Sequence, residues 1–141
     1  MPVQHEAPAV AIARAHVEAW TNHDFDTARD GLAPDVTFTI TTTQPISQTI
    51  ELTGADDYLK GLTQAAQFAV PGSLRISAST GDERNALLML TYEVDFGAGN
   101  EEDFGAEAWK GKWTLSVARL YRLDDNNKIK AEHITYYMAQ H

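Results

Sequence analysis

The sequence contains no cysteine, and this absence removes several classes of chemistry at once. It excludes a disulfide framework, a thiolate zinc site and a cysteine nucleophile. Residues 1–8 have neither a basic start nor an apolar run, so no signal peptide is predicted. No stretch of the chain approaches the roughly 20 apolar residues that a membrane span requires. We therefore expect a cytoplasmic protein.

Basic residues are scarce, with 11 Lys and Arg against 20 Asp and Glu, which gives a net charge of −9. Binding to nucleic acid or to an anionic membrane surface depends on clustered basic side chains, so neither partner is expected. Hydrophobic residues make up 43% of the chain and charged residues 22%, a balance typical of globular proteins. The length of 141 residues predicts one domain, 1–141.

The N-terminal part of the chain is predicted to be helical. Along residues 9–21, apolar side chains recur at helical spacing: Val10, Ala13, Val17 and Trp20. A second short helix follows, with Asn22 or Asp24 as its cap and Pro34 at its end. The buried stripe of that helix is predicted to contain Phe25, Ala28 and Leu32.

Most of the remaining chain has the patterns of β-strands. Apolar and polar residues alternate over residues 35–43, and Thr53 with Asp56 resembles a capping box for a third helix that runs to about residue 69. Further strands are predicted over 46–52, 73–79, 85–96, 109–123 and 128–138. Helices followed by antiparallel strands predict an α+β fold, in which a curved sheet wraps around the N-terminal helices and encloses a pocket on its concave side.

Three local stretches resemble one known superfamily. Residues 16–39 (HVEAWTNHDFDTARDGLAPDVTFT), 52–62 (LTGADDYLKGL) and 121–137 (YRLDDNNKIKAEHITYY) are similar to the first helices, third helix and closing hairpin of nuclear transport factor 2-like proteins. The similarity is greatest to the SnoaL-like and ketosteroid isomerase-like branches. It implies a cone-shaped, mixed but mainly antiparallel sheet. It does not imply one activity, because this fold hosts isomerases, dehydratases, hydrolases, cyclases and binding proteins.

The resemblance can be followed to single positions. His16 falls where ketosteroid isomerases place the tyrosine of their oxyanion hole, and Arg119 falls where they place its protonated acid. Ile40 falls where they place the general base, which argues against steroid isomerisation by the known route. Epoxide hydrolases of this fold join two carboxylates through an arginine. Arg119 and Glu132 match part of that set, but Val117 and Tyr121 leave no second acid beside the arginine.

His16 is a polar residue on the apolar face of the first helix. On a helical wheel it lies almost opposite Arg14 and Glu18, while Ile12 and Trp20 flank it one turn away on either side. A buried imidazole needs a hydrogen-bond partner. Two interpretations stay open: a core histidine bonded to a backbone carbonyl, or a pocket residue that acts as a donor or as an acid or base.

Arg119 and Glu132 are predicted to form an ion pair on the inward face of the closing hairpin. A loop of two or four residues would set them directly opposite each other, whereas a loop of three or five would break this register. The same register would set two more pairs opposite each other: Val117 with Ile134, and Leu115 with Tyr136. The pair can be structural, or it can serve a reaction.

Together these residues define a predicted pocket. Its polar groups, and its candidate catalytic residues, are Glu132, Arg119 and His16. Its apolar wall is predicted to contain Trp20, Phe38, Ile40, Leu90, Tyr92 and Tyr136. The histidines are not spaced as metal ligands on one face, and there is no glycine-rich phosphate loop, so neither a metal nor a cofactor is expected.

The outward face of the last strands carries apolar residues that need cover: Leu87, Met89, Leu120 and Tyr137. We expect a homodimer formed sheet to sheet, with cover by the segment 97–105 as the alternative. For the pocket, three functions compete. They are an isomerase, lyase, cyclase or hydrolase that uses proton transfer, a protein that binds a small ligand unchanged, and an interaction module. The sequence favours the enzyme slightly over the binding protein.

Overall fold

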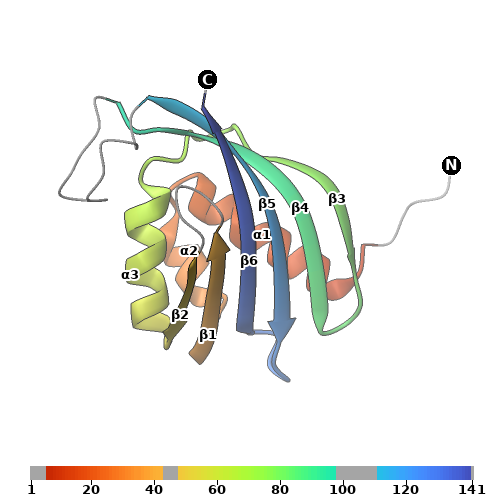
Figure 1. Ribbon diagram of the computed structural model, residues 1–141. Coiled ribbons are helices and arrows are strands. Elements are labelled where there is room, and N and C mark those ends of the chain that lie inside the picture. The colour runs from red at the N-terminus through yellow and green to blue at the C-terminus, as the bar shows by residue number, and fades with distance from the viewer. Residues whose placement is uncertain (1–5, 43–47, 98–110, 141) are drawn as a thin grey trace, which may run out of the picture.

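The computed structural model of the chain describes residues 6–42, 48–97 and 111–140 (Figure 1). The helices within these ranges are α1 (Pro8–Thr21), α2 (Phe25–Asp30) and α3 (Ala55–Ala66). The strands are β1 (Leu32–Thr42), β2 (Gln48–Thr53), β3 (Arg75–Gly81), β4 (Asn85–Asp95), β5 (Lys112–Leu123) and β6 (Ile129–Gln140).

The strands form one curved sheet in the order β2-β1-β6-β5-β4-β3. The β1–β6 pair is parallel, and the other neighbours are antiparallel. Figure 1 shows the helices on one side of the sheet, with α1 crossing behind β4 to β6 and α3 beside β1 and β2. The predicted α+β fold, with a mixed and mainly antiparallel sheet wrapped around helices, is therefore confirmed.

The alternation of residues along the strands decides which face meets the helices. On β4 and β5 the inward side chains are buried: Leu88, Leu90, Tyr92, Val94, Leu115, Val117, Arg119 and Tyr121. The predicted apolar stripe of α1 packs against them and forms one core. The faces of β4 and β5 were thus predicted correctly from their period of two.

The predicted ends of α2 and α3 were partly wrong. Leu32 and Pro34 belong to β1 rather than to the end of α2, and Pro34 lies where the β1–β6 ladder shifts register. Proline has no N–H to give to a ladder, so an irregular stretch accommodates it. Thr53 is the last residue of β2, where it pairs with Thr37 of β1, and it does not cap α3. The cap is Gly54, whose φ of 97° favours glycine.

The β5–β6 hairpin differs from the predicted register. Its loop consists of residues 124–128, and a register shift between Arg122 and Leu123 adds one residue to the facing strand. The odd loop alone would turn Glu132 outward, but the bulge restores its inward face. Glu132 therefore lies opposite Tyr121, and Arg119 lies opposite Ile134, two positions further along β6. The other predicted pairs are wrong by the same two positions, since Val117 faces Tyr136 and Leu115 faces Met138.

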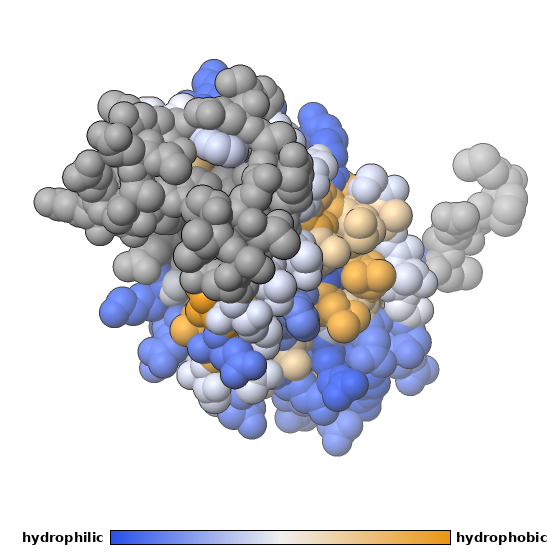
Figure 2. All heavy atoms as spheres, in the orientation of Figure 1, coloured by the Kyte–Doolittle hydropathy of each residue, from blue (hydrophilic) through white to orange (hydrophobic). Residues whose placement is uncertain are grey.

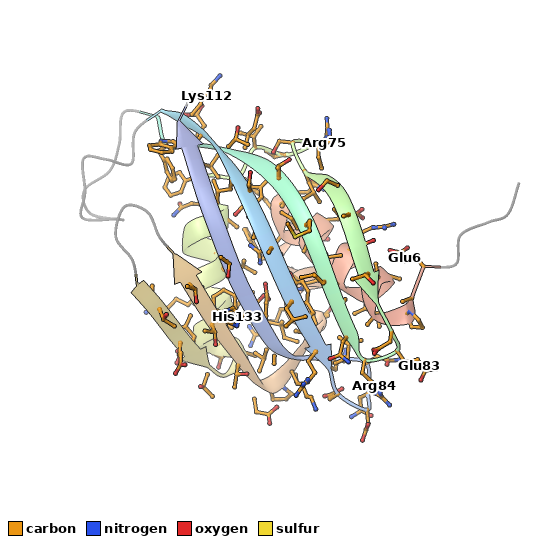
Figure 3. All side chains as sticks on the ribbon, turned by 45° about the vertical axis from the view of Figure 1, so that its right-hand side comes forward. Glu6, Arg75, Glu83, Arg84, Lys112 and His133 are labelled. Carbon is orange, nitrogen blue, oxygen red and sulfur yellow. The ribbon has the colours of Figure 1, made fainter. Side chains whose placement is uncertain are left out.

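The turn between β3 and β4 closes on the start of α1. The amide of Ala9 donates to the carbonyl of Asp82 at 3.2 Å. A Cβ atom on Gly81 would lie 2.3 Å from the carbonyl oxygen of Asn85 and 2.9 Å from a methyl carbon of Val10. Arg84, labelled at this end of the sheet in Figure 3, reaches the β5–β6 loop, where its Nη2 lies 3.3 Å from Asp125.

The convex face of the sheet carries an exposed apolar surface, which we call the outer apolar patch. Leu87 pairs with Leu120 and Met89 with Ala118, so these four side chains adjoin. Met89 is 43% exposed and Leu120 is 49% exposed. Figure 2 shows apolar atoms on this face, among polar ones. The predicted outward direction of Leu87, Met89 and Leu120 is confirmed. The side chain of Tyr137 and the segment 98–110 lie outside the described parts of the chain.

Candidate functional site

Glu132 is a carboxylate buried in the interior of the fold. It lies on the inward face of β6, where the residue is 2% exposed. The guanidinium of Arg119, on the neighbouring strand β5, is buried beside it. An Nη1 atom of Arg119 donates to Oε1 of Glu132 at 2.5 Å. The two residues are diagonal neighbours across the hairpin, a separation that long side chains span. A buried charge requires a compensating partner, and each residue supplies one for the other.

Tyr58 on α3 supplies the second hydrogen bond to this carboxylate. Its hydroxyl donates to Oε2 of Glu132, and its side chain is 1% exposed. The ring of Phe38 packs edge-on against the ring of Tyr58 at 4.7 Å between centroids. Tyr58 belongs to the buried stripe of α3, with Leu62 and Ala66. Sequence reasoning missed this residue, although its helical spacing to Leu62 was a usable signal that it is buried.

His16 completes the chain of polar contacts. Its Nε2 lies 3.0 Å from the hydroxyl of Tyr58, and its side chain is buried in the middle of α1. The partner of Nε2 is therefore a side chain of the site rather than a backbone carbonyl. Burial lowers the pKa of His16, while the nearby carboxylate of Glu132 opposes that effect in part. The ring is consequently neutral near pH 7.

Arg119 is charged in this interior. Burial by itself would lower the pKa of its guanidinium, but Tyr121 and Glu132 raise it above its ordinary value. The guanidinium carbon also lies 4.5 Å from the centroid of the Trp20 ring, which gives a cation–π contact. Arg119 is thus held from two sides, by a carboxylate and by an aromatic face.

Two fully buried tyrosines lie beside the carboxylate. Burial raises the pKa of Tyr58 and of Tyr121 well above the usual value, and the negative charge of Glu132 raises both further. Both phenols therefore keep their protons and can act as hydrogen-bond donors. Tyr121 lies directly opposite Glu132 in the ladder.

Several buried polar atoms around the ion pair have no hydrogen-bond partner within the described ranges. They belong to four neighbouring side chains: Nδ1 of His16, Nε1 of Trp20, Nε of Arg119 and the hydroxyl of Tyr121. Buried polar groups are normally paired, so a group of unpaired atoms around one ion pair needs a reason.

The predicted apolar wall lies in the same interior. Trp20, Phe38, Leu90 and Tyr92 are buried members of the core, and Ile40 is half-buried against it. Nothing is described for the side chain of Tyr136, although its backbone pairs with Val117. The structure thus brings His16, Arg119 and Glu132 together and sets most of the predicted wall around them.

Two hollows open on the surface elsewhere, around α2 and α3. One is lined by residues of α2 and α3, including Arg29, Leu59 and Thr63. The other lies between the α2–β1 corner and the start of α3, and its lining includes Asp30, Leu32 and Asp57. Among the described residues, no three His, Asp or Glu side chains are grouped as metal ligands. No helix in the described ranges has the length and apolar character to cross a membrane.

Comparison with known proteins identifies the family. The model of the SnoaL-like domain matches residues 13–132, so the chain belongs to the SnoaL-like domain family. No curated protein matches the chain.

Solved structures of the same fold cover most of the chain. A putative SnoaL-like polyketide cyclase from Shewanella putrefaciens is 16% identical, with a TM-score of 0.70, over 94% of this chain and 91% of that one. A protein with a ketosteroid isomerase-like fold from Catenulispora acidiphila, in complex with trimethylamine, is 17% identical, with a TM-score of 0.64, over 94% and 87%. An LEH-like epoxide hydrolase from M. tuberculosis is 16% identical, with a TM-score of 0.63, over 92% and 83%. At these identities the similarity establishes the fold alone.

Proposed function

We propose that the protein is an enzyme that binds a small, partly apolar molecule on the concave side of the sheet and transfers a proton to or from it through Glu132. The observation that carries this proposal is a buried carboxylate held from one side by Arg119 and from the other by Tyr58. A general acid or base needs a fixed position, and the hydrogen bonds from Arg119 and Tyr58 hold Glu132 in place.

The neighbouring groups have complementary roles in the proposed reaction. Arg119 orients Glu132 and stabilises negative charge that develops beside it. The unpaired atoms of Trp20, Arg119 and Tyr121 supply hydrogen-bond donors for an oxygen of the substrate. Proteins of the same fold that are named as a putative polyketide cyclase and an epoxide hydrolase give the fold a precedent for chemistry on small organic molecules.

A binding protein without catalysis is the second candidate. Both carboxylate oxygens of Glu132 already have partners, and an ion pair in this state can serve stability or ligand recognition alone. The relative that holds trimethylamine is consistent with ligand binding in this fold. The two candidates differ in what happens to a bound molecule.

The test begins with the ligand. Small molecules that co-purify with the protein are released and identified by mass spectrometry, and their binding and turnover are measured for the wild type and for Glu132→Gln. We expect turnover to be lost in Glu132→Gln while binding is largely retained. Glu93→Gln, an exposed glutamate on β4, is the matched control and leaves both unchanged.

Two other outcomes decide against the enzyme. Binding without turnover in the wild type identifies a binding protein, and normal binding with normal turnover in Glu132→Gln makes the ion pair structural. Because Glu132→Gln leaves Arg119 buried without a counter-charge, the double variant Arg119→Met with Glu132→Gln provides a folded reference.

We also propose that a second copy of the chain covers the outer apolar patch. Its members Leu87, Met89, Ala118 and Leu120 adjoin on the convex face, away from the site. Exposed apolar surface of this kind marks an interaction site, and a self-complementary twofold contact covers it on both copies at once.

A further inference from the structure

The hydrogen bonds of Tyr58 determine the tautomer of His16. The hydroxyl of Tyr58 has a single proton, and it gives this proton to Glu132. Its oxygen can therefore only accept from Nε2 of His16, 3.0 Å away. In a neutral ring the one hydrogen then lies on Nε2, and Nδ1, which makes no hydrogen bond in the described ranges although the Ala28 carbonyl acts on the ring, carries a lone pair. The contacts thus form a directed chain: His16 donates to Tyr58, and Tyr58 donates to Glu132.

Nδ1 of His16 lies beneath Gly31, the residue between α2 and β1. A Cβ atom built on Gly31 would lie 3.8 Å from Nδ1 and 3.6 Å from the carbonyl oxygen of Ala28. Gly31 is half-buried and has a φ of −80°, so its backbone does not itself require glycine. The absence of a Cβ atom at Gly31 therefore leaves space for about one methyl group beside Nδ1.

The surface next to Gly31 is hollow and acidic. Asp30 and Leu32, its neighbours in the chain, line the hollow at the α2–β1 corner together with Asp56 and Asp57 of α3. Arg29 is also in this lining, but its guanidinium is paired with Asp56 at 2.9 Å. Carboxylates at the mouth of a depression attract positive charge from solvent.

We propose that His16 and Tyr58 form a proton relay that connects Glu132 with the surface hollow beside Gly31. The relay rests on the proposed role of Glu132 as the group that exchanges a proton with substrate, and it gives Glu132 a route by which it exchanges one proton with solvent. Tyr58 and His16 act through Glu132, so both are positioning and relay residues rather than catalytic ones.

The proton count balances in each direction. A proton from solvent binds Nδ1 of His16, the Nε2 proton passes to the oxygen of Tyr58, and the hydroxyl proton of Tyr58 passes to the carboxylate of Glu132. Glu132 is then neutral, Tyr58 is again a phenol, and His16 is the Nδ1–H tautomer. The reverse sequence, starting from that tautomer, returns a proton from Glu132 to solvent. Each complete transfer therefore switches the tautomer of His16.

The groups that face His16 favour brief rather than lasting protonation. Burial in α1 disfavours the charged ring most and Arg119 on β5 adds to this effect, while Glu132 on β6 and the backbone carbonyl of Ala28 in α2 oppose it. Tyr58 on α3 and Tyr121 on β5 are neutral phenols. A residue in a proton relay must release its proton as readily as it takes it up. His16 meets this need, because burial favours the neutral ring while Glu132 offsets part of the cost of charging it.

The first measurement is the tautomer of His16 by ¹⁵N-detected NMR of the imidazole ring near pH 7.5. We expect the neutral Nε2–H form in the wild type. In Tyr58→Phe, which removes the acceptor of that hydrogen, we expect a mixture of the two tautomers. A wild-type ring that is charged or carries its hydrogen on Nδ1 overturns the relay, as does an unchanged tautomer in Tyr58→Phe.

The second measurement tests the route at Gly31. The Cε1 hydrogen of histidine exchanges slowly in D₂O once solvent reaches the ring, and mass spectrometry follows this exchange for each histidine. Gly31→Val fills the space beside Nδ1, so we expect His16 to exchange several-fold more slowly while the exposed His133 is unaffected. Gly61→Ala is the matched control, because its added methyl meets Leu52 rather than a polar group. Gly31→Ala serves as the smaller substitution if the valine variant does not fold.

If the Cε1 hydrogen of His16 exchanges at the same rate in the wild type, Gly31→Val and Gly31→Ala, the proposed route to the surface is wrong. Neither measurement uses a substrate, so both outcomes are independent of the turnover test on Glu132. A protein that shows the tautomer switch and the Gly31 effect but no turnover retains the relay as a proton connection and loses the proposed enzyme.

Discussion

Two buried tyrosines beside Glu132 offer a comparison in which only the hydroxyl contacts differ. Tyr58→Phe removes the donor to a buried carboxylate and the acceptor for His16, so we expect a loss of about 2 kcal/mol in the free energy of unfolding. Tyr121→Phe removes a hydroxyl that makes no hydrogen bond in the described ranges, although Arg119 and Glu132 act on it, and is expected to change stability by less than about 0.5 kcal/mol. Urea denaturation measures both.

Equal losses in the two variants would contradict this assignment of the hydrogen bonds. The same pair also reports on the proposed ligand. If the hydroxyl of Tyr121 is reserved for the substrate, Tyr121→Phe weakens ligand binding although it leaves stability unchanged.

The burial of His16 predicts a dependence of stability on pH. The pKa of His16 is lowered in the folded protein, so below about pH 6.5 the unfolded chain takes up a proton that the folded chain does not. The stability tied to neutral His16 is therefore present above pH 6.5 and is lost as the pH falls, by up to about 1.4 kcal/mol for each pH unit.

Thermal denaturation between pH 7.5 and 5.5 measures this effect. We expect His16→Gln to remove most of the slope in this window, and His133→Gln, at an exposed position on β6 (Figure 3), to leave it unchanged. An identical slope in the wild type and His16→Gln would assign the dependence to another group. The lowered pKa values of Asp24 and Asp82 act at lower pH, because those carboxyl groups start from a value near 3.8.

At the residue scale, the sequence predicted the buried polar groups but not how they are joined. The position of His16 on the apolar face of α1, and of Arg119 and Glu132 on inward strand faces, followed from local periodicity. Tyr58 was missed because periodicity says that a residue is buried and does not say what it meets. Its contact with Glu132 depends on how α3 packs on β1, the neighbour of β6, and α3 and β6 are far apart in the chain.

At the scale of elements, loop length and bulges set the register, and they are the features that sequence patterns predict least. In the β5–β6 hairpin an odd loop and one bulge cancel, so the predicted faces were right while the predicted cross-strand pairs were wrong. The ion pair formed nonetheless, because diagonal neighbours on one face remain within reach of two long side chains. Every residue of a strand contributes to the alternating pattern that predicts which side chains point inward. The pairing of residues across two strands depends instead on a few residues in and beside the turn.

The β3–β4 turn gives a prediction at the same scale. Gly81→Ala places a methyl group 2.3 Å from the backbone oxygen of Asn85 and against Val10 of α1, contacts that backbone cannot easily relieve. We expect a loss of about 2 kcal/mol or more in unfolding free energy, measured by urea denaturation. Gly31→Ala is the control, because its added carbon meets atoms only at ordinary contact distances, and it is expected to unfold like the wild type.

At the scale of the whole molecule, the outer apolar patch predicts association. We expect the wild type to sediment as a dimer, and Leu120→Arg, at the centre of the patch, to sediment as a monomer with unchanged stability. Ile50→Arg is the matched control, since Ile50 is 39% exposed on β2, away from the patch. A monomeric wild type, or loss of the dimer in both variants, would contradict this interface. Because each chain carries a charge of −9, added salt is expected to tighten the dimer by screening repulsion.

The parallel contact between β1 and β6 has a consequence for synthesis of the chain. β1 is made before its parallel partner β6, and β2 to β5 lie between them in the chain, so the middle of the sheet can close only after β6 has been made. Until then α1 and β1 have no β6 to cover them, and the growing chain depends on its antiparallel hairpins, which can pair earlier. Because β6 also carries Glu132, the step that completes the fold is the step that assembles the site.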